Sequence, residues 1–196
     1  MWKYKTPGIP DDEFERTEEV PITKEEVRTL QISKARLNQG QVVYDIGCGS
    51  GSISIEAALQ VESSGQVYAI DFDSKAVELT KKNIEKFGVT NVNVILGNAK
   101  EKIFQLPEAD AIFIGGTGGD TKEILELCVD KLKTDGRIVI GIILIETLYS
   151  VLSYIEKLNF KSIDITQITI SKSRKTSTGT MMLARNPVTV VSATKC

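Results

Sequence analysis

From residue 41 onward, short apolar runs of strand length alternate with longer segments that have helical periodicity. The runs are rich in β-branched residues and are bounded by glycine, proline or polar residues, as is typical of strands. This alternation predicts an α/β fold: a mostly parallel sheet with helices on both faces. Strands are expected at 41–46, 66–71, 91–97, 109–114 and 137–145, and helices at 52–62, 74–87 and 120–133.

The pattern changes in the last third of the chain. A helix around 146–158 is followed by two runs, 160–171 and 179–193, which alternate or are β-branched and are joined by a polar turn. The turn has no room for a crossover helix, so the two runs should be antiparallel neighbours. We therefore expect a seven-stranded sheet that closes with a C-terminal antiparallel hairpin.

The first 40 residues predict an N-terminal arm and a helix that precede the main domain at 41–196, within a single-domain chain. Thr23 is expected to be the N-cap of that helix. Glu26, three residues later, would complete a capping box with Thr23.

Composition supports a folded globular protein, with 41% hydrophobic and 26% charged residues in 196. The longest apolar run, 138–145, is far shorter than the roughly 20 residues that cross a bilayer. No secretory signal is evident at the N-terminus. Cys48, Cys128 and Cys196 have neither metal-binding spacing nor the pattern of a disulfide framework. We expect a cytoplasmic protein with no bound metal and no membrane partner.

The chain contains no histidine, which excludes histidine-dependent triads and zinc–histidine sites. Its formal net charge is −2 and its pI is about 5.4, so the overall field does not favour nucleic acid. Any chemistry must depend on carboxylates, hydroxyls, amides and the ligands themselves, and a nucleic-acid partner is not expected.

A glycine-rich turn follows the first predicted strand, with glycines at 47, 49 and 51. Glycines allow a sharp turn and a close approach to a ligand, and the amides at the following helix N-terminus favour ligand binding. In a dinucleotide-binding motif the third glycine would stand at Ser52. Asp71 ends the second strand and is the candidate ribose ligand. Asp73 is the alternative, although its position predicts a helix N-cap.

The run Asp45-x-Gly-x-Gly-x-Gly resembles the first motif of the class I methyltransferases, which bind S-adenosylmethionine (SAM). In that fold the adenine lies against the residues after strand three, here Asn98 and Ala99. The Asn98 side chain and the Ala99 amide could contact the adenine edge. The alternative for this pair is a simple turn cap.

The fourth strand is followed by Gly115, Gly116, Thr117 and two further glycines. Methyltransferases that act on base amino groups usually carry proline and an aromatic residue here, and this chain has neither. The bare backbone predicts a wide opening that suits a bulky acceptor. The alternative is a flexible loop before the next helix.

Several segments spread over nearly the whole chain resemble the decarboxylating cobalt-precorrin-6B C15-methyltransferase family of cobalamin biosynthesis. They are Pro10–Phe14, Thr23-x-x-Glu26-Val27-Arg28, the glycine motif, Ile114–Gly119, Glu146-Thr147 and Gly179-Thr180-Met181-Met182-x-x-Arg185-Asn186-Pro187-Val188. The resemblance implies methylation of a corrin precursor at C15, with loss of the C12 acetate carboxyl group, in the anaerobic route.

The resemblance also implies SAM as co-substrate, a corrinoid substrate and a homotetramer. With the two residues after strand three included, the expected SAM contacts are Thr23, Gly47, Cys48, Gly49, Ser50, Gly51, Asp71, Asn98 and Ala99.

The corrinoid carries several carboxylates, so cationic partners are expected. Lys172, Arg174, Lys175 and Arg185 are the candidates, with Gly115, Gly116 and Thr117 at the opening. A solvated surface run is the alternative for the cations. Glu146 could handle a proton, although glutamate is also favoured in the first turn of a helix.

Three other functions fit parts of the pattern. A tRNA adenine-N1 methyltransferase shares the SAM motifs, and a non-catalytic SAM-binding subunit would share the fold. An NAD-dependent oxidoreductase fits the glycine spacing less well.

Overall fold

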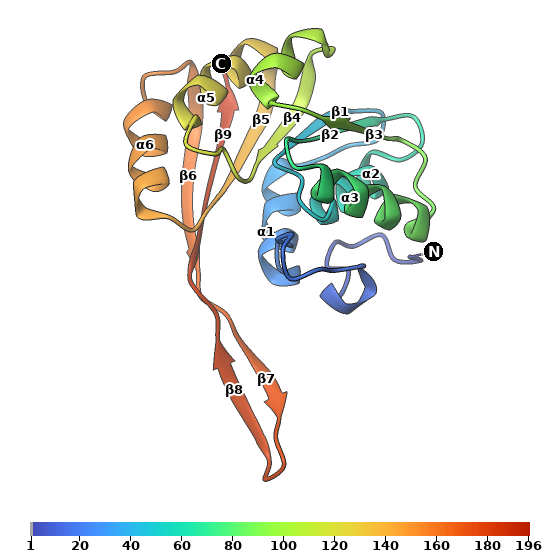
Figure 1. Cartoon of the computed structure of the whole chain (residues 1–196). Coiled ribbons are helices and arrows are strands. Elements are labelled where there is room, and N and C mark those ends of the chain that lie inside the picture. The colour runs from blue at the N-terminus through green and yellow to red at the C-terminus, as the bar shows by residue number, and fades with distance from the viewer. Residues whose placement is uncertain (1) are drawn as a thin grey trace.

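The computed structural model describes residues 2–196, and its centre is a seven-stranded sheet with strand order β3-β2-β1-β4-β5-β9-β6 (Figure 1). Strands β1 to β5 run parallel, and β9 runs antiparallel to both of its neighbours, β5 and β6. A separate two-stranded sheet, β7–β8, projects from one end of the body. The predicted fold class is confirmed.

The strands are β1 (Val42–Ile46), β2 (Gln66–Asp71), β3 (Val92–Leu96), β4 (Ala109–Ile114), β5 (Leu132–Ile142), β6 (Phe160–Ile168), β7 (Ser171–Lys175), β8 (Thr180–Ala184) and β9 (Val188–Lys195). The helices are α1 (Glu25–Ala35), α2 (Ser52–Val61), α3 (Ser74–Phe87), α4 (Ala99–Lys102), α5 (Thr121–Lys131) and α6 (Ile145–Ile155), with short 3-10 turns η1 (Asp11–Glu13) and η2 (Ile103–Gln105).

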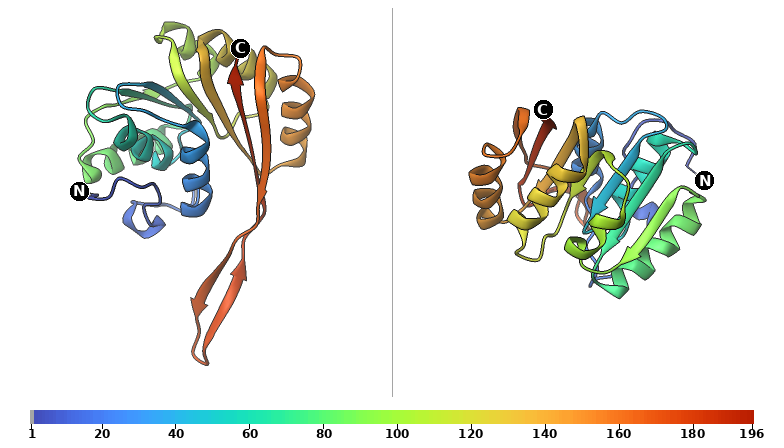
Figure 2. Two further views of the ribbon diagram at one scale, coloured as in Figure 1. Left: turned by 180° about the vertical axis from the view of Figure 1, so that it is seen from behind. Right: turned by 90° about the horizontal axis from the view of Figure 1, so that it is seen from above.

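Side chains that alternate along the central strands form two separate apolar clusters, one on each face of the sheet. Helices lie against both faces (Figure 2). Val43 and Phe113 belong to the cluster with α1 and α2, whereas Tyr44 and Ile112 belong to the cluster with α5 and α6. Because both faces are covered, the ligand-accessible part of the parallel sheet is its carboxyl edge.

Strand β5 begins five residues earlier than predicted, at Leu132 instead of 137. Helix α5 ends at Lys131, and the chain then becomes extended at once. The pairing register between β4 and β5 shifts between Leu132 and Arg137. Asp135, between these two residues, has a left-handed φ of 61°. The predicted helix at 120–133 is therefore too long, because polar residues here form a bulged strand and not a last helical turn.

The predicted Thr23 cap and its capping box with Glu26 are wrong. Helix α1 begins at Glu25, and no side chain of the adjoining residues caps it. Instead, the amide of Glu25 donates to the Asp11 carboxylate at 2.9 Å. The backbone carbonyl of Thr23 accepts from the Arg28 guanidinium. A cap that comes from 14 residues away leaves no local sequence signal.

The N-terminal arm is held to the body by Arg28, whose side chain is fully buried. Its guanidinium donates to Glu56 at 2.6 Å and to Asp11 at 3.3 Å, and also to the backbone carbonyl of Ile9. Glu56 in turn accepts from the amides of Gly8 and Ile9, at 3.0 and 2.9 Å. The arm therefore depends on one buried ionic cluster.

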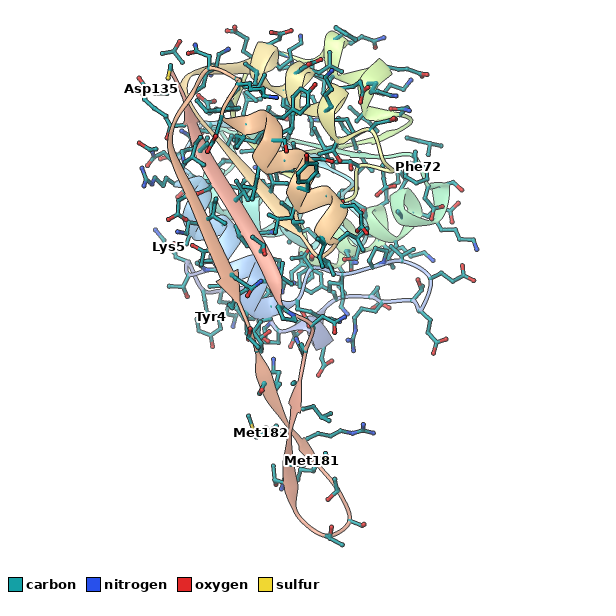
Figure 3. All side chains as sticks on the ribbon, turned by 90° about the vertical axis from the view of Figure 1, so that its left-hand side faces the viewer. Tyr4, Lys5, Phe72, Asp135, Met181 and Met182 are labelled. Carbon is teal, nitrogen blue, oxygen red and sulfur yellow. The ribbon has the colours of Figure 1, made fainter. Side chains whose placement is uncertain are left out.

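The two C-terminal runs are antiparallel neighbours, as predicted, but each is divided into two strands. Near the body β6 pairs with β9, and beyond it β7 pairs with β8, with Arg174 opposite Met181. Met181 and Met182 lie on the part of the hairpin that extends past the sheet (Figure 3). Every residue of β8 is exposed. Among residues 2–196, no helix is both long and apolar enough to cross a membrane.

Candidate functional site

A cavity of about 230 Å³ lies at the carboxyl edge of the sheet, between the loops that follow β1, β2, β3 and β4. The residues that line it are Ile46, Gly47, Ile70, Asp71, Phe72, Gly97, Asn98, Ala99, Gly116, Thr117, Gly118, Asp120 and Ile124. Its location is the topological switch region where ligands bind in open α/β sheets.

The loops after β1 and β4 touch each other at this cavity. The amide of Gly115 donates to the Ile46 carbonyl at 2.8 Å. Gly47 has φ of +73°, and a Cβ there would lie 2.7 Å from the Gly116 carbonyl oxygen. Only glycine can occupy position 47 without displacing the facing loop.

The arm covers the other side of the glycine loop. The amide of Ser50 donates to the Pro21 carbonyl at 3.2 Å, and a Cβ on Gly49 would lie 2.7 Å from the same oxygen. Thr23 stands two residues beyond this contact. The Ser50 hydroxyl is buried in the loop and has no hydrogen-bond partner within residues 2–196.

Asp71 both lines the cavity and organises the loops around it. Its Oδ2 accepts from the amide of Gly49 at 2.9 Å, and its Oδ1 accepts from the amide of Asp73 at 3.0 Å. A carboxylate has about four lone-pair sites, so acceptor capacity remains for a ligand hydroxyl. Asp73 instead accepts from the amide of Lys75 at 2.9 Å and is the N-cap of α3, as its position predicts.

Two ionisable groups at the glycine loop are almost fully buried, Asp45 just before the loop and Cys48 within it. Asp45 accepts a hydrogen bond from the Ser54 hydroxyl. Burial, together with the nearby charge of Asp71, nevertheless raises the pKa of the Asp45 carboxyl to about 6. Burial also raises the pKa of the Cys48 thiol. Cys48 therefore stays protonated, with its sulfur 3.6 Å from the Thr80 hydroxyl.

The raised pKa of Asp45 makes stability depend on pH. In the unfolded chain the Asp45 carboxyl has an ordinary pKa of about 3.9. Between roughly pH 4 and 6 the folded state therefore binds more protons than the unfolded state. The contribution of Asp45 to the free energy of unfolding falls as pH rises through this range. We expect Asp45→Asn to gain about 1–3 kcal/mol relative to wild type between pH 4 and 7. Urea unfolding across this range measures the difference. Asp130→Asn, at an exposed carboxylate of α5, is the control. A stability difference between Asp45→Asn and wild type that does not change with pH would contradict the prediction.

Asn98 and Ala99 lie at the cavity, as the expected adenine contacts should. Asn98 is also the N-cap of α4, because its side-chain oxygen accepts from the amide of Lys100 at 2.9 Å. The turn-cap interpretation is thus correct for the oxygen, while the amide nitrogen of the side chain makes no hydrogen bond within residues 2–196.

Gly116 and Thr117 line the cavity, and Gly115 lies just behind them against Gly47. A Cβ added to Gly116 would meet no atom within 4 Å, so protein packing does not require glycine there. The Thr117 hydroxyl is hydrogen-bonded to that of Thr121 at 2.8 Å. The loop therefore leaves open space beside the cavity, as the sequence suggested.

Two of the four candidate substrate cations are paired within the chain. Lys172 lies 2.8 Å from Glu25 and 2.9 Å from Glu26, and Arg185 lies 3.1 Å from Glu26. These contacts hold the root of the hairpin against the first turn of α1. The charges of Lys172 and Arg185 are thus already balanced within the chain, and their role toward the substrate stays a prediction.

Arg174 and Lys175 lie further out on β7. Both are exposed and make no ion pair within residues 2–196. Of the four predicted cations, these two are available to an external carboxylate.

Glu146 lies in the first turn of α6, is exposed and does not line the cavity. Three exposed apolar residues, Ile143, Leu144 and Ile145, precede it, and Tyr149 follows on the same helix. Sequence reasoning missed this patch because it predicted a strand at 137–145, whereas β5 ends at Ile142. No local signal in the sequence marks the end of the strand, because residues 143–145 are as apolar as those before them.

The residues around the cavity fit SAM. Its sugar hydroxyls need an acceptor such as Asp71, its purine fits walls such as Ile70 and Ala99, and the buried Ser50 hydroxyl leaves a polar group unused in the loop. Within residues 2–196, no cluster of three or more histidine, cysteine, aspartate or glutamate side chains is arranged to hold a metal ion.

Comparisons with known proteins agree with this geometry. A sequence model described as Precorrin methyltransferase domain matches residues 12–195. A protein of Saccharolobus solfataricus named probable cobalt-precorrin-6B C(15)-methyltransferase (decarboxylating) is 48% identical over 196 residues, which cover 99% of this chain and 98% of that protein.

Two solved structures are also similar over nearly their whole length. Precorrin 8w decarboxylase from Methanobacterium thermoautotrophicum has a TM-score of 0.89 and 37% identity, covering 94% of this chain and 98% of that one. Precorrin-6y C5,15-methyltransferase from Geobacter metallireducens has a TM-score of 0.91 and 33% identity, covering 98% of this chain and 100% of the other.

Proposed function

Because the chain belongs to the precorrin methyltransferase family, we propose that it methylates C15 of cobalt-precorrin-6B and removes the carboxyl group of the C12 acetate as CO2. The observation that carries the proposal is the cavity itself. It joins a SAM-type glycine loop and the carboxylate of Asp71 to the open, glycine-lined loop after β4. A bulky, multiply charged acceptor needs such an opening.

SAM would be held by the loop Gly47–Gly51, by Asp71 at the ribose and by Asn98 and Ala99 at the adenine, with Thr23 near the glycine loop. When bound, SAM supplies an electrophilic methyl group on a sulfonium. The chain's part is to orient the acceptor carbon in line with that group and to exclude water.

This chemistry does not require a histidine. The meso carbon C15 is nucleophilic because the conjugated ring supplies electrons to it. In the second step the C–CO2 bond breaks, its electron pair enters the ring, and a proton is taken up where CO2 leaves. Arg174 and Lys175 would balance peripheral carboxylates of the substrate, because they are exposed and have no ion pair within residues 2–196.

Glu146 is the proposed proton-handling residue, since it stands at the carboxyl edge of the sheet after β5. We expect Glu146→Ala to lower turnover about tenfold or more while the Kd for SAM stays the same. Steady-state kinetics and calorimetry measure the two quantities. Glu156→Ala, at the other end of the same helix, is the control; unchanged turnover in Glu146→Ala would remove the role.

The function is tested by anaerobic incubation with SAM and cobalt-precorrin-6B, followed by mass spectrometry of the product. One methyl group gained and one CO2 lost would establish both reactions on this chain. Methylation without CO2 loss would remove decarboxylation from the proposal. No reaction in a sample that binds SAM would overturn it and favour a tRNA acceptor or a non-catalytic role.

We also propose that the protein is a homotetramer in the cytoplasm. Its exposed hairpin carries Met181, Met182 and Leu183, of which Met182 is 61% exposed, on strands that bury no side chain in this chain. Such an apolar surface fits a second copy of the chain. All three cysteines are free thiols, which suits a reducing compartment.

Charges on the hairpin should therefore disrupt assembly. We expect Met181→Asp with Met182→Asp to convert the oligomer to smaller species, because two carboxylates would be buried in an apolar contact. Sedimentation velocity measures this change. Phe104→Asp, at an exposed apolar residue of η2, is the matched control. An unchanged sedimentation coefficient in the double variant would contradict assembly through the hairpin.

A further inference from the structure

The loops that follow β3 and β4 are joined by an ion pair at the cavity. Lys100, in α4, lies with its Nζ 2.6 Å from Oδ2 of Asp120, the residue just before α5. Asp120 lines the cavity together with Asn98, Ala99 and Ile124. A carboxylate is thus fixed beside the part of the cavity where the purine of a nucleoside is expected.

The polar side chains of the cavity differ in how much hydrogen-bonding capacity they leave for a ligand. Both oxygens of Asp71 accept backbone amides, the oxygen of Asn98 accepts the Lys100 amide, and the Thr117 hydroxyl is bonded to Thr121. The ion pair occupies only Oδ2 of Asp120, and its Oδ1 makes no hydrogen bond within residues 2–196. Asp120 therefore provides a carboxylate oxygen that no group of the protein uses.

The chemistry of that oxygen selects one kind of purine edge. An ionised carboxylate accepts hydrogen bonds and donates none. It matches an exocyclic amine, as on adenine, and repels a carbonyl oxygen at the same ring position. Apolar walls such as Ile124 and Ala99 strengthen the selection, because a hydrogen bond beside apolar surface is screened less than one in open water.

We propose that Asp120 recognises the adenine of the nucleoside by accepting a hydrogen bond from its exocyclic amine, with Lys100 holding the carboxylate in place. This assignment rests on the proposed SAM site. It makes Asp120 a specificity-determining residue, in addition to Asn98 and Ala99 on the facing loop.

The side chain of Asp120 can be changed with little effect on folding. It makes no capping hydrogen bond to α5. Its pair with Lys100 is partly exposed to solvent, with side-chain exposures of 35% for Lys100 and 42% for Asp120, and such pairs contribute little to stability. Substitutions at this position therefore test recognition, and a thermal melt verifies that each variant is folded.

The test is calorimetric binding of S-adenosylhomocysteine and of its 6-oxo analogue, which carries hypoxanthine in place of adenine. Wild type should prefer the adenine compound by about tenfold to a hundredfold, the effect of one hydrogen bond to a charged group. Asp120→Ala should lose most of this preference. Asp120→Asn should shift it toward the 6-oxo compound, because the new amide can donate to the carbonyl.

Asp135→Asn is the matched control, since Asp135 also pairs with a lysine at 2.6 Å but lies at the end of the molecule opposite the hairpin (Figure 3). It should keep the wild-type preference. A preference that is the same in Asp120→Ala and wild type would overturn the assignment while leaving the SAM site intact. Failure of wild type to bind S-adenosylhomocysteine at all would instead overturn the proposed function on which the assignment rests.

Discussion

Arg28→Ala is expected to lower the free energy of unfolding by about 3–5 kcal/mol, which is the cost of removing one partner of a buried ion pair. Arg28 is fully buried, and its removal leaves the carboxylates of Glu56 and Asp11 without their cation in the interior. Its guanidinium also lies 4.8 Å from the centre of the Phe14 ring, so packing is lost as well. Urea unfolding followed by circular dichroism measures the change.

Arg16→Ala is the matched control, because Arg16 pairs with Asp12 at 2.7 Å on the surface. It should change stability by no more than about 0.5 kcal/mol. Equal effects of the two substitutions would show that the buried cluster does not hold the arm. The affinity for SAM should also fall in Arg28→Ala, since the arm places Pro21 on the glycine loop.

Gly47→Ala is expected to abolish turnover and to weaken SAM binding at least about tenfold. A left-handed conformation costs a non-glycine residue roughly 1–2 kcal/mol. In addition, the new Cβ would lie 2.7 Å from the carbonyl oxygen of Gly116, so the loops after β1 and β4 must separate. Calorimetry with S-adenosylhomocysteine measures the binding, and a thermal melt measures the stability.

Gly40→Ala separates backbone strain from crowding. Gly40 has φ of +82°, but its nearest contact would be 3.7 Å away, and it lies before β1, at the edge of the sheet opposite the cavity. This variant should lose stability yet keep its affinity for the ligand. Equal ligand affinity in Gly47→Ala and wild type would show that the two loops need not touch for binding.

Local signals predicted the parts of the site that depend on neighbours in the sequence. The glycine loop and Asp71 follow directly from two strand ends, and the Asp73 cap of α3 follows from its position before that helix. The alternation of apolar runs with helical segments likewise predicted the sheet, because the central strands bury both faces.

What the sequence could not reveal depends on tertiary contacts. The cap of α1 comes from Asp11, and the charges of Lys172 are balanced by Glu25 and Glu26, far away in the chain. The free oxygen of Asp120 emerges only when α4 and the loop before α5 are brought together. Periodicity identifies which residues are buried, but it does not identify their partners.

The exposed hairpin β7–β8 divides the chain into two regions of unequal local stability. A two-stranded ribbon that buries no side chain has little stability of its own, whereas the β1–β4 sheet lies between two apolar clusters. Exchange of amide hydrogens in the hairpin therefore reports contact with another surface, while exchange in the central strands reports global unfolding. Assembly and folding of this chain can thus be followed separately in one measurement.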